Sequence, residues 1–255
     1  MPGYTFNSWW GCTRISPACR DCYADTWATR VGRPDLWAPH GPRRFFGEDH
    51  WNDPLKWQRR AADIGEMHAV FCASMADVGE DRRDLDPWRD RLWGLIARTP
   101  NLLWLLVTKR ADVLRRVVPW ADGAWPRNVW FGVTVESAEY LPRAEEAIRA
   151  RAARTFISYE PALEPVDFRP VLGAERVSWL IVGTESGSSR RARQMQIGWA
   201  IDAVEQARAA GVSPFVKQVD AELLQLGRRG EPIKDLAHFP PPLRVREWPE
   251  ILEAA

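Results

Sequence analysis

Leu102-Leu-Trp-Leu-Leu-Val-Thr108 is the stretch that decides the fold class of this chain. A continuous apolar run of this length is typical of a strand that is buried on both faces, whereas a strand with one wet face alternates. Similar runs occur at residues 68–74, 129–135, 155–159, 179–182 and 213–216. We therefore predict six buried strands of a parallel sheet, and a short extended piece at residues 4–6 adds a first strand.

Amphipathic stretches lie between these runs. Asp86-Pro87 predicts a helix start, because proline suits the first turn, and the apolar residues that follow share one face. Two further apolar stripes have helical spacing, the first made of Leu141, Ala144, Ile148 and Ala152 and the second of Ile197, Ile201, Val204 and Ala207. Gly211 would end the second helix. Strand and helix alternate about six times, which predicts a parallel α/β fold. The pattern fits an open sheet and a barrel equally well.

Composition bounds the class of protein. The chain has 255 residues, of which 45% are hydrophobic and 27% charged, and this suits one globular domain with a full core. The start has no signal-peptide pattern and no run is long enough to cross a bilayer, so we expect a cytoplasmic protein without membrane contact. The net charge of +1 does not indicate a nucleic-acid binder. We interpret the arginines at 149–154 and at Arg190, Arg191 and Arg193 as solvated surface.

Polar residues follow the strands at their carboxyl ends, where both open sheets and barrels place active residues. Carboxylates beside cations would bind a reactant that bears both an amine and a carboxylate, and a carboxylate would also bind a ribose. The alternative is that these groups only form ion pairs with one another. The residues concerned are Ser74, Asp77, Lys109, Arg110, Thr134, Glu136, Glu160, Glu185, Lys217 and Gln218.

Three of the four cysteines lie within eleven residues, in the pattern Cys12-x6-Cys19-x2-Cys22. Thiolates prefer zinc, Cu(I) and iron–sulfur clusters. Structural zinc would need a fourth ligand, whereas a [4Fe-4S] cluster on three cysteines leaves one iron open to a reactant. The spacing leaves both interpretations open, and a disulfide is less favoured in a chain without secretory context. The candidates for a fourth zinc ligand are His40 and His50, both in or near a loop broken by Pro and Gly, and Cys72.

Cys72 lies in the middle of an apolar run, where a free cysteine behaves as a small buried hydrophobic residue. It also has the spacing to share a strand face with Ser74. If Ser74 lines a site, Cys72 would lie beneath it as a thiol hydrogen-atom donor.

A set of motifs in chain order resembles an uncharacterised, phage-associated family of the radical S-adenosylmethionine superfamily. The motifs are Asn7-Ser-Trp-Trp-Gly-Cys12 with Cys19 and Cys22, Ser74-Met-Ala-Asp77, Leu106-Val-Thr-Lys-Arg110, Asn128-Val-Trp-Phe-Gly-Val-Thr-Val-Glu136, Ser158-Tyr-Glu-Pro161, Val182-Gly-Thr-Glu-Ser-Gly187 and Phe215-Val-Lys-Gln218. The chain departs from the superfamily in having six residues, not three, between its first two cysteines. It also has Thr184 and Tyr159 where relatives more often have Gly and Cys.

The resemblance implies a partial parallel (β/α) barrel of about six to seven strands, similar to a TIM barrel. The single domain would comprise a cysteine loop and N-terminal extension (1–65), β/α repeats (66–220) and a tail packing on the barrel (221–255). Cys12, Cys19 and Cys22 would hold a [4Fe-4S] cluster whose open iron binds S-adenosylmethionine. Reduction by an electron donor would give a 5′-deoxyadenosyl radical that abstracts a hydrogen atom.

Roles of the rim residues follow from the same resemblance. Ser74 and Asp77 would lie at the methionine end and Glu136 at the ribose, whereas Lys217 and Gln218 would meet the substrate, with Cys72 as a further catalytic candidate. The other cofactor-binding candidates are Lys109, Thr134, Glu160 and Glu185.

The distant likeness to spore photoproduct lyase implies a nucleic-acid or nucleotide substrate. Two alternatives stay open from the sequence. One is a zinc-stapled, non-enzymatic nucleic-acid-binding protein. The other is a cluster-bearing partner, without catalysis, of a protein encoded nearby.

Overall fold

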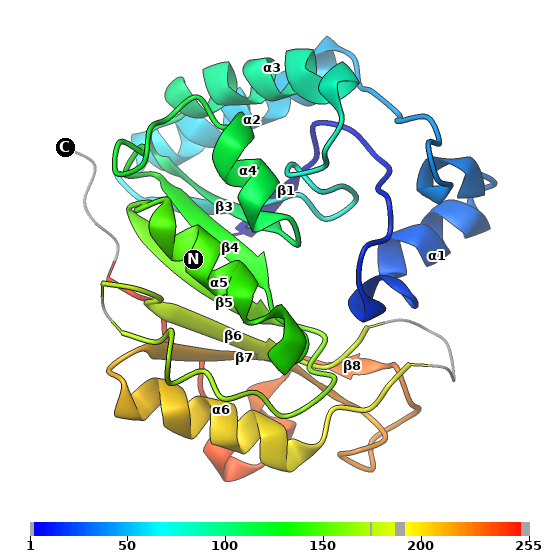
Figure 1. Ribbon diagram of the computed structural model, residues 1–255, viewed down its shortest axis with the longest axis vertical. Helices are drawn as coiled ribbons and strands as arrows, with labels where there is room; N and C mark the ends of the chain where they lie inside the picture. The colour runs from blue at the N-terminus through cyan, green and yellow to red at the C-terminus, as the bar shows by residue number, and fades with distance from the viewer. Residues whose placement is uncertain (1–2, 174, 187–191, 251–255) are drawn as a thin grey trace.

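The computed structural model describes residues 3–173, 175–186 and 192–250. Within these residues eight strands form one sheet in chain order, and the sheet curls into a half-barrel (Figure 1). β1 to β7 are parallel, and β8 pairs with β7 in the antiparallel direction. The strands are β1 Gly3–Phe6, β2 His68–Cys72, β3 Leu102–Thr108, β4 Val129–Thr134, β5 Arg154–Tyr159, β6 Trp179–Gly183, β7 Ser213–Asp220 and β8 Pro232–Ile233.

The parallel α/β class and the partial barrel are confirmed, but the strand number of six to seven was too low. Every predicted run contains a strand, and the extended piece at residues 4–6 belongs to β1. The additional strand, β8, has only two residues, Pro232 and Ile233, so it produces no apolar pattern. Its position comes from its pairing with Val219 and Asp220 of β7.

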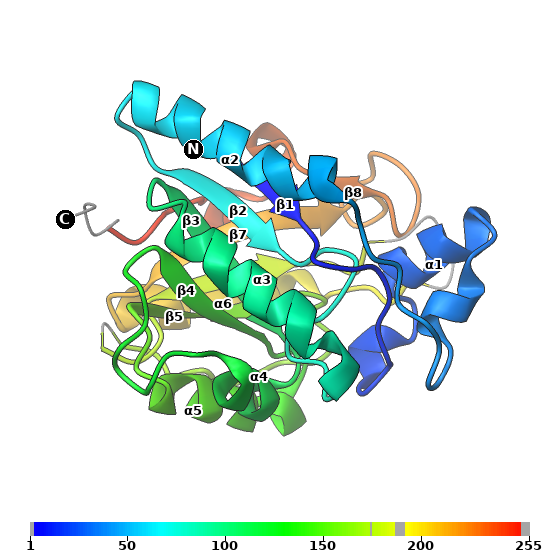
Figure 2. The same cartoon turned by 90° about the horizontal axis from the view of Figure 1, so that it is seen from above.

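Helices cover the outer face of the sheet (Figure 2). α2 packs on β2 and β3, α5 on β4 and β5, and α6 on β6 and β7. α1 lies apart from them, beside the cysteine loop at the carboxyl end of the strands. The helices are α1 Tyr23–Arg30, α2 Glu48–Asp63, α3 Asp86–Ala97, α4 Ala111–Val117, α5 Pro142–Arg149 and α6 Ile197–Ala209. No helix in the described part of the chain is long and apolar enough to cross a membrane.

The three predicted helices correspond to α3, α5 and α6. Pro87 lies in the first turn of α3, and Gly211 follows α6 at φ +67°, a left-handed conformation that favours glycine. α2 was not predicted, because Pro54 and many charged residues obscure its period. His50, which the sequence placed in or near the broken loop, lies just after it, in the first turn of α2.

The two faces of the sheet carry different cores. The outer core includes Cys72, Trp104 and Phe131 and continues into the helices. The inner core consists of Ala69, Leu103, Leu105, Trp130, Phe156 and Trp179. A Cβ on Gly132 would lie 2.2 Å from the Phe156 ring, so this inner position requires glycine. Side chains alternate along a strand, and the residues two positions after this inner core therefore face the same concave side.

The C-terminal segment closes the other end of the half-barrel. The Trp248 ring lies 4.5 Å from that of Trp179 and 5.9 Å from that of Phe215. Trp179 Nε1 donates a hydrogen bond of 2.9 Å to the carbonyl of Glu247. Residues 251–255 of the predicted tail lie outside the described part. The inner core is thus covered at the amino-terminal ends of the strands by the C-terminal segment.

Candidate functional site

A cavity of about 400 Å³ lies between the carboxyl ends of the strands and the cysteine loop, residues 12–22. Its floor continues the concave face of the sheet through Phe71, Val107 and Ser158. Of the site residues predicted from the sequence, the structure brings together on its wall all except Cys72 and Glu136. The predicted residues that line the cavity are Cys12, Cys19, Cys22, Ser74, Asp77, Lys109, Thr134, Glu160, Glu185, Lys217 and Gln218.

The three clustered cysteines are free and half-buried. Cys12 and Cys22, like Trp10 and Met75, pack against a small apolar cluster of Ala24, Ala28, Leu36 and Trp37. Burial raises the pKa of the Cys12 thiol to about 12, and the carboxylate of Asp77 adds to the rise. Burial also raises the pKa of Cys22, against the positive charge of Lys109. Both thiols are therefore neutral near pH 7, and a bound metal would have to displace their protons.

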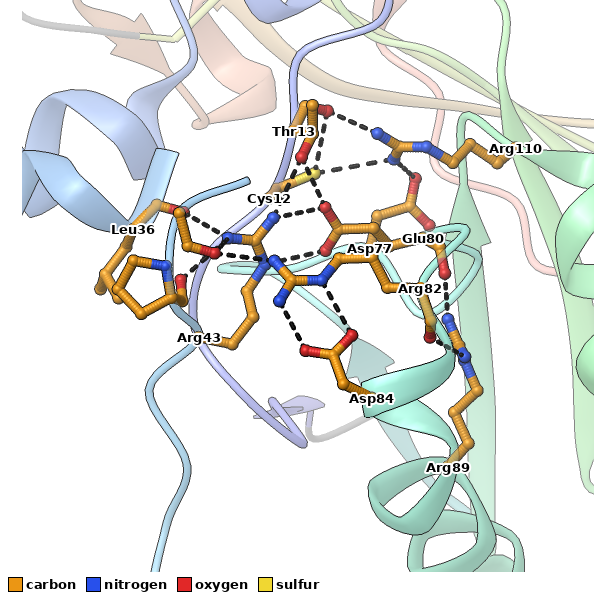
Figure 3. A network of polar contacts seen from close by, with 12 residues as sticks. Cys12, Thr13, Leu36, Arg43, Asp77, Glu80, Arg82, Asp84, Arg89 and Arg110 are labelled. Atoms are coloured by element: carbon orange, nitrogen blue, oxygen red, sulfur yellow. Dashed lines mark hydrogen bonds and ion pairs between the residues drawn. The ribbon is translucent and has the colours of Figure 1, made fainter. Parts of the chain in front are cut away.

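Arg110 connects the cysteine loop to the sheet (Figure 3). Its Nη1 donates to Asp77 Oδ2 at 2.8 Å and to Cys12 Sγ at 3.7 Å. Its Nη2 donates to the carbonyl oxygen of Thr13. The residue lies two positions after β3, and its backbone N–H donates to the hydroxyl of Thr108, the last residue of that strand, at 2.9 Å. One planar guanidinium thus positions the first cysteine relative to the strand ends.

A buried ion pair between Arg43 and Glu80 contacts the cysteine loop at Thr13. The side chains of Arg43 and Glu80 are 0% and 2% exposed, and Arg43 Nε donates to Glu80 Oε2 at 2.9 Å. The hydroxyl of Thr13 donates to Glu80 Oε1 at 2.8 Å. Arg43 Nη1 also donates to the carbonyl oxygens of Leu36, Gly41 and Pro42. Sequence reasoning missed this pair, because Glu80 precedes Asp81 in a stretch that resembles a solvated acidic turn.

Asp77 is held by the protein itself. Its Oδ1 accepts from the backbone of Gly79 at 2.9 Å and from the hydroxyl of Thr108 at 2.5 Å. Its Oδ2 accepts from the backbone of Lys109 at 3.2 Å as well as from Arg110. These four bonds occupy the carboxylate, so its contacts are those of a residue that positions the loops after β2 and β3.

Glu160, Lys217 and Gln218 form one group on the opposite wall. Lys217 Nζ lies 2.9 Å from both carboxylate oxygens of Glu160. Gln218 Nε2 donates to Glu160 Oε1 at 3.1 Å and to the carbonyl of Thr184 at 3.0 Å. The sequence placed Lys217 and Gln218 after a strand, but β7 continues to Asp220, so both lie within it. Their backbones are therefore fixed by strand pairing.

Glu185 belongs to a contact between the sheet and the cysteine loop. Its Oε2 accepts from the Arg193 backbone at 2.8 Å and from Arg193 Nε at 3.1 Å. Arg193 Nη2 donates to the carbonyl of Pro17 at 2.9 Å. The interpretation of Arg193 as plain solvated surface was therefore incomplete. Arg190 and Arg191, its neighbours in the predicted basic cluster, lie outside the described residues.

Cys72 and Glu136 lie away from the cavity wall. Cys72 is fully buried in the outer core. The expected alternation with Ser74 does not apply, because β2 ends at Cys72 and the chain turns there. Glu136 is 0% exposed and pairs with Arg143 through Oε2 at 2.8 Å. The alternative that rim carboxylates form ion pairs with neighbouring cations therefore describes this residue.

Thiolates are ligands for iron–sulfur clusters and for zinc, and three free thiols line this cavity. Among the described residues, no group of three His, Cys, Asp or Glu side chains is arranged to hold one metal ion. His50 Nε2 lies 2.8 Å from the carbonyl oxygen of Asn7, and neither His50 nor His40 lines the cavity. Each cysteine of a [4Fe-4S] cluster binds its own iron, so three free thiols around one cavity suit that group.

The fold and the cavity together define an α/β half-barrel protein with a cysteine-lined site at the carboxyl ends of its parallel strands. Residues 3–230 match a family described as proteins of unknown function, DUF5131, and the chain belongs to that family. No curated protein and no solved structure matches the chain. The family description names no activity, so the function has to be argued from the cavity.

Proposed function

We propose that the protein is a radical S-adenosylmethionine enzyme with one [4Fe-4S] cluster. The observation that carries the proposal is that three free cysteines, spaced Cys-x6-Cys-x2-Cys, line one cavity at the carboxyl ends of a parallel half-barrel. When bound, the reduced cluster would supply the electron that cleaves S-adenosylmethionine into methionine and a 5′-deoxyadenosyl radical, which takes a hydrogen atom from the substrate.

Cys12, Cys19 and Cys22 would hold the cluster. The residues around them support this role by fixing the loop before any cofactor arrives. Arg110 and the pair of Arg43 and Glu80 contact Thr13, the residue next to the first cysteine. A preorganised loop loses little conformational freedom on binding, which favours a bound cofactor.

Lys109 and Ser74 are the best placed groups for the methionine end of S-adenosylmethionine. Lys109 lies near enough to Cys22 for its charge to act on that thiol. Within the described residues its ammonium has no hydrogen-bond or ion-pair partner, so it is available to a carboxylate. The Ser74 hydroxyl accepts from Asn7 Nδ2 at 3.1 Å and keeps its own proton for donation.

Thr134 and Glu160 are further cofactor-binding candidates on the cavity wall. Thr134 ends β4 and Glu160 follows β5, so both are fixed by neighbouring strands. The apolar cluster with Trp10 beside Cys12 and Cys22 would limit access of water to the site.

The test is anaerobic reconstitution with iron and sulfide, followed by dithionite and S-adenosylmethionine. We expect brown protein with about four iron atoms per chain and release of 5′-deoxyadenosine. The matched control is Cys72→Ala, which removes the fourth cysteine without touching the cavity and should keep both properties. A fully loaded cluster that releases no 5′-deoxyadenosine would contradict the proposed activity. Binding of S-adenosylmethionine without cleavage would identify a non-catalytic cluster protein instead.

A further inference from the structure

The lysines of this chain are concentrated at the cavity. Only four of the 35 Lys and Arg residues are lysine. Lys109, Lys217 and Lys234 line the cavity, whereas Lys56 lies on α2 and pairs with Asp53. Lysine differs from arginine in presenting a compact charge with three rotatable donors, which suits a ligand that is not held in a planar, bidentate manner.

The charges on the wall do not balance. Every carboxylate that lines the cavity has a cationic partner: Asp21 with Arg20, Asp77 with Arg110, Glu160 with Lys217 and Glu185 with Arg193. The ammonium groups of Lys109 and Lys234 have no such partner in the described part of the chain. The wall therefore carries uncompensated positive charge, and an anion that enters the cavity would neutralise it.

Lys217 and Lys234 are held side by side. β7 and β8 pair with Val219 opposite Ile233, and Lys234 is the residue directly after β8. Arg246 Nη2 donates to the carbonyl oxygen of Lys217 at 2.9 Å and also to that of Lys234. The Arg246 guanidinium thus contacts the backbone of both residues, and we call Lys217 and Lys234 the lysine edge.

An unused hydroxyl lies on the same wall. Thr184 is 0% exposed and lines the cavity, and its Oγ1 has no hydrogen-bond partner. Its carbonyl accepts from Gln218, the residue next to Lys217 in β7. A buried hydroxyl without a partner loses free energy, and a ligand oxygen at this wall would recover it. The lysine edge and Thr184 are therefore complementary to an anion with several acceptor oxygens.

We propose that the lysine edge binds a phosphate group of the substrate. A phosphate has the charge to engage Lys234 and to draw the half-exposed Lys217 from Glu160, and it has further oxygens for Thr184. That the phosphate belongs to the substrate from which a hydrogen atom is taken rests on the proposed function. The binding of a phosphate at the lysine edge does not. Lys234 lies outside residues 3–230, the stretch that matches the family. The lysine edge therefore combines Lys217 of the matched stretch with a residue of the C-terminal segment.

The experiment measures binding to the full chain, without cluster, by isothermal titration calorimetry at low salt. The probes are thymidine 5′-monophosphate and thymidine, which differ only in the phosphate and do not mimic the adenosine of the cofactor. We expect the phosphate to strengthen binding at least tenfold. Lys234→Ala should weaken binding of the monophosphate about tenfold, and Lys234→Arg should restore most of it. Lys56→Ala is the matched control and should change nothing.

Equal affinity for the two probes would overturn the proposal, as would an equal loss in Lys56→Ala. Lys234 is exposed, so its substitution should leave the fold intact, which circular dichroism checks. A ten-nucleotide thymidine strand distinguishes the source of the phosphate. Tighter binding of the strand than of the monophosphate indicates a nucleic acid, and equal binding a free nucleotide. Release of 5′-deoxyadenosine is measured separately. Phosphate binding can therefore fail while the proposed activity stands, and the activity can fail while phosphate binding stands.

Discussion

At the scale of single residues, Arg110 connects the sheet to the first cysteine. It contacts Asp77, the carbonyl of Thr13 and the sulfur of Cys12. Arg110 and Asp77 are each 9% exposed, so neither charge is fully hydrated. Burial by itself would lower the pKa of Arg110, but Asp77, Cys12 and Glu80 together more than offset it and raise that pKa. The guanidinium is therefore charged near pH 7, as arginine is in proteins generally.

Arg110→Met should destabilise the protein without cluster by about 3 kcal/mol, because it leaves the Asp77 carboxylate buried without its cation. Urea unfolding followed by circular dichroism measures this change. Arg115→Met is the control on the neighbouring α4. Its partner Asp122 is 40% exposed, so we expect a loss below about 1 kcal/mol. Equal losses in the two variants would show that Arg110 is an ordinary surface arginine.

Replacing each cysteine in turn separates the ligands from the core. Cys12→Ala, Cys19→Ala and Cys22→Ala should each lower the iron content of reconstituted protein from about four atoms per chain to below about one. Cys72→Ala should retain the full content, since Cys72 lies in the outer core. Iron and sulfide assays with the absorbance near 400 nm measure the outcome. Retention of a full cluster in Cys19→Ala would remove the proposed ligand set.

At the scale of elements, β4 and β5 show how the cavity floor is built. Trp130, Gly132 and Thr134 alternate on the concave face, beside Phe156 and Ser158 of the next strand. Trp130 and Phe156 belong to the inner core, whereas Thr134 and Ser158 line the cavity. Gly132 leaves room for the Phe156 ring between the two layers.

Gly132→Ala should therefore destabilise the protein by about 1–3 kcal/mol, because its Cβ would overlap the Phe156 ring. The combination with Phe156→Leu should recover part of this loss, since the smaller side chain vacates the space. Thermal unfolding of the two single variants and the double variant measures the coupling. Strictly additive losses would mean that the contact between β4 and β5 is not the cause.

Much of the architecture could be predicted from the sequence, because buried parallel strands produce long apolar runs such as residues 102–108. The gathering of polar strand ends on one cavity followed from the same parallel order. Glu136 could not be placed, since its position depends on Arg143, which is seven residues away on another element. Arg43 and Glu80 were missed for the same reason, because a buried ion pair between distant loops leaves no local pattern.

At the scale of the whole molecule, the half-barrel is covered at its two ends by the two ends of the chain. The C-terminal segment packs Trp248 on the inner core, and the N-terminal cysteine loop covers the carboxyl ends of the strands. The loop contacts the sheet through Arg110, and Arg193 reaches it at Pro17. The candidate cofactor site therefore lies where two separately held parts of the chain meet.

Binding of a cluster should stabilise that junction more than the sheet. Hydrogen exchange in residues 12–30 should slow at least tenfold on reconstitution, because three thiolate bonds would tie the loop to one group. β3 should change little, since it is buried in both forms. Mass spectrometry of the forms with and without cluster compares them. Equal slowing across the chain would indicate global stabilisation without a site at the loop.

Metal analysis of anaerobically purified protein, joined to electron paramagnetic resonance, tests the central claim most directly. The account predicts about four iron atoms and no zinc per chain. It also predicts a signal from the dithionite-reduced cluster that changes when S-adenosylmethionine binds the open iron. One zinc ion per chain without iron would contradict it, and so would a cluster signal that S-adenosylmethionine leaves unchanged.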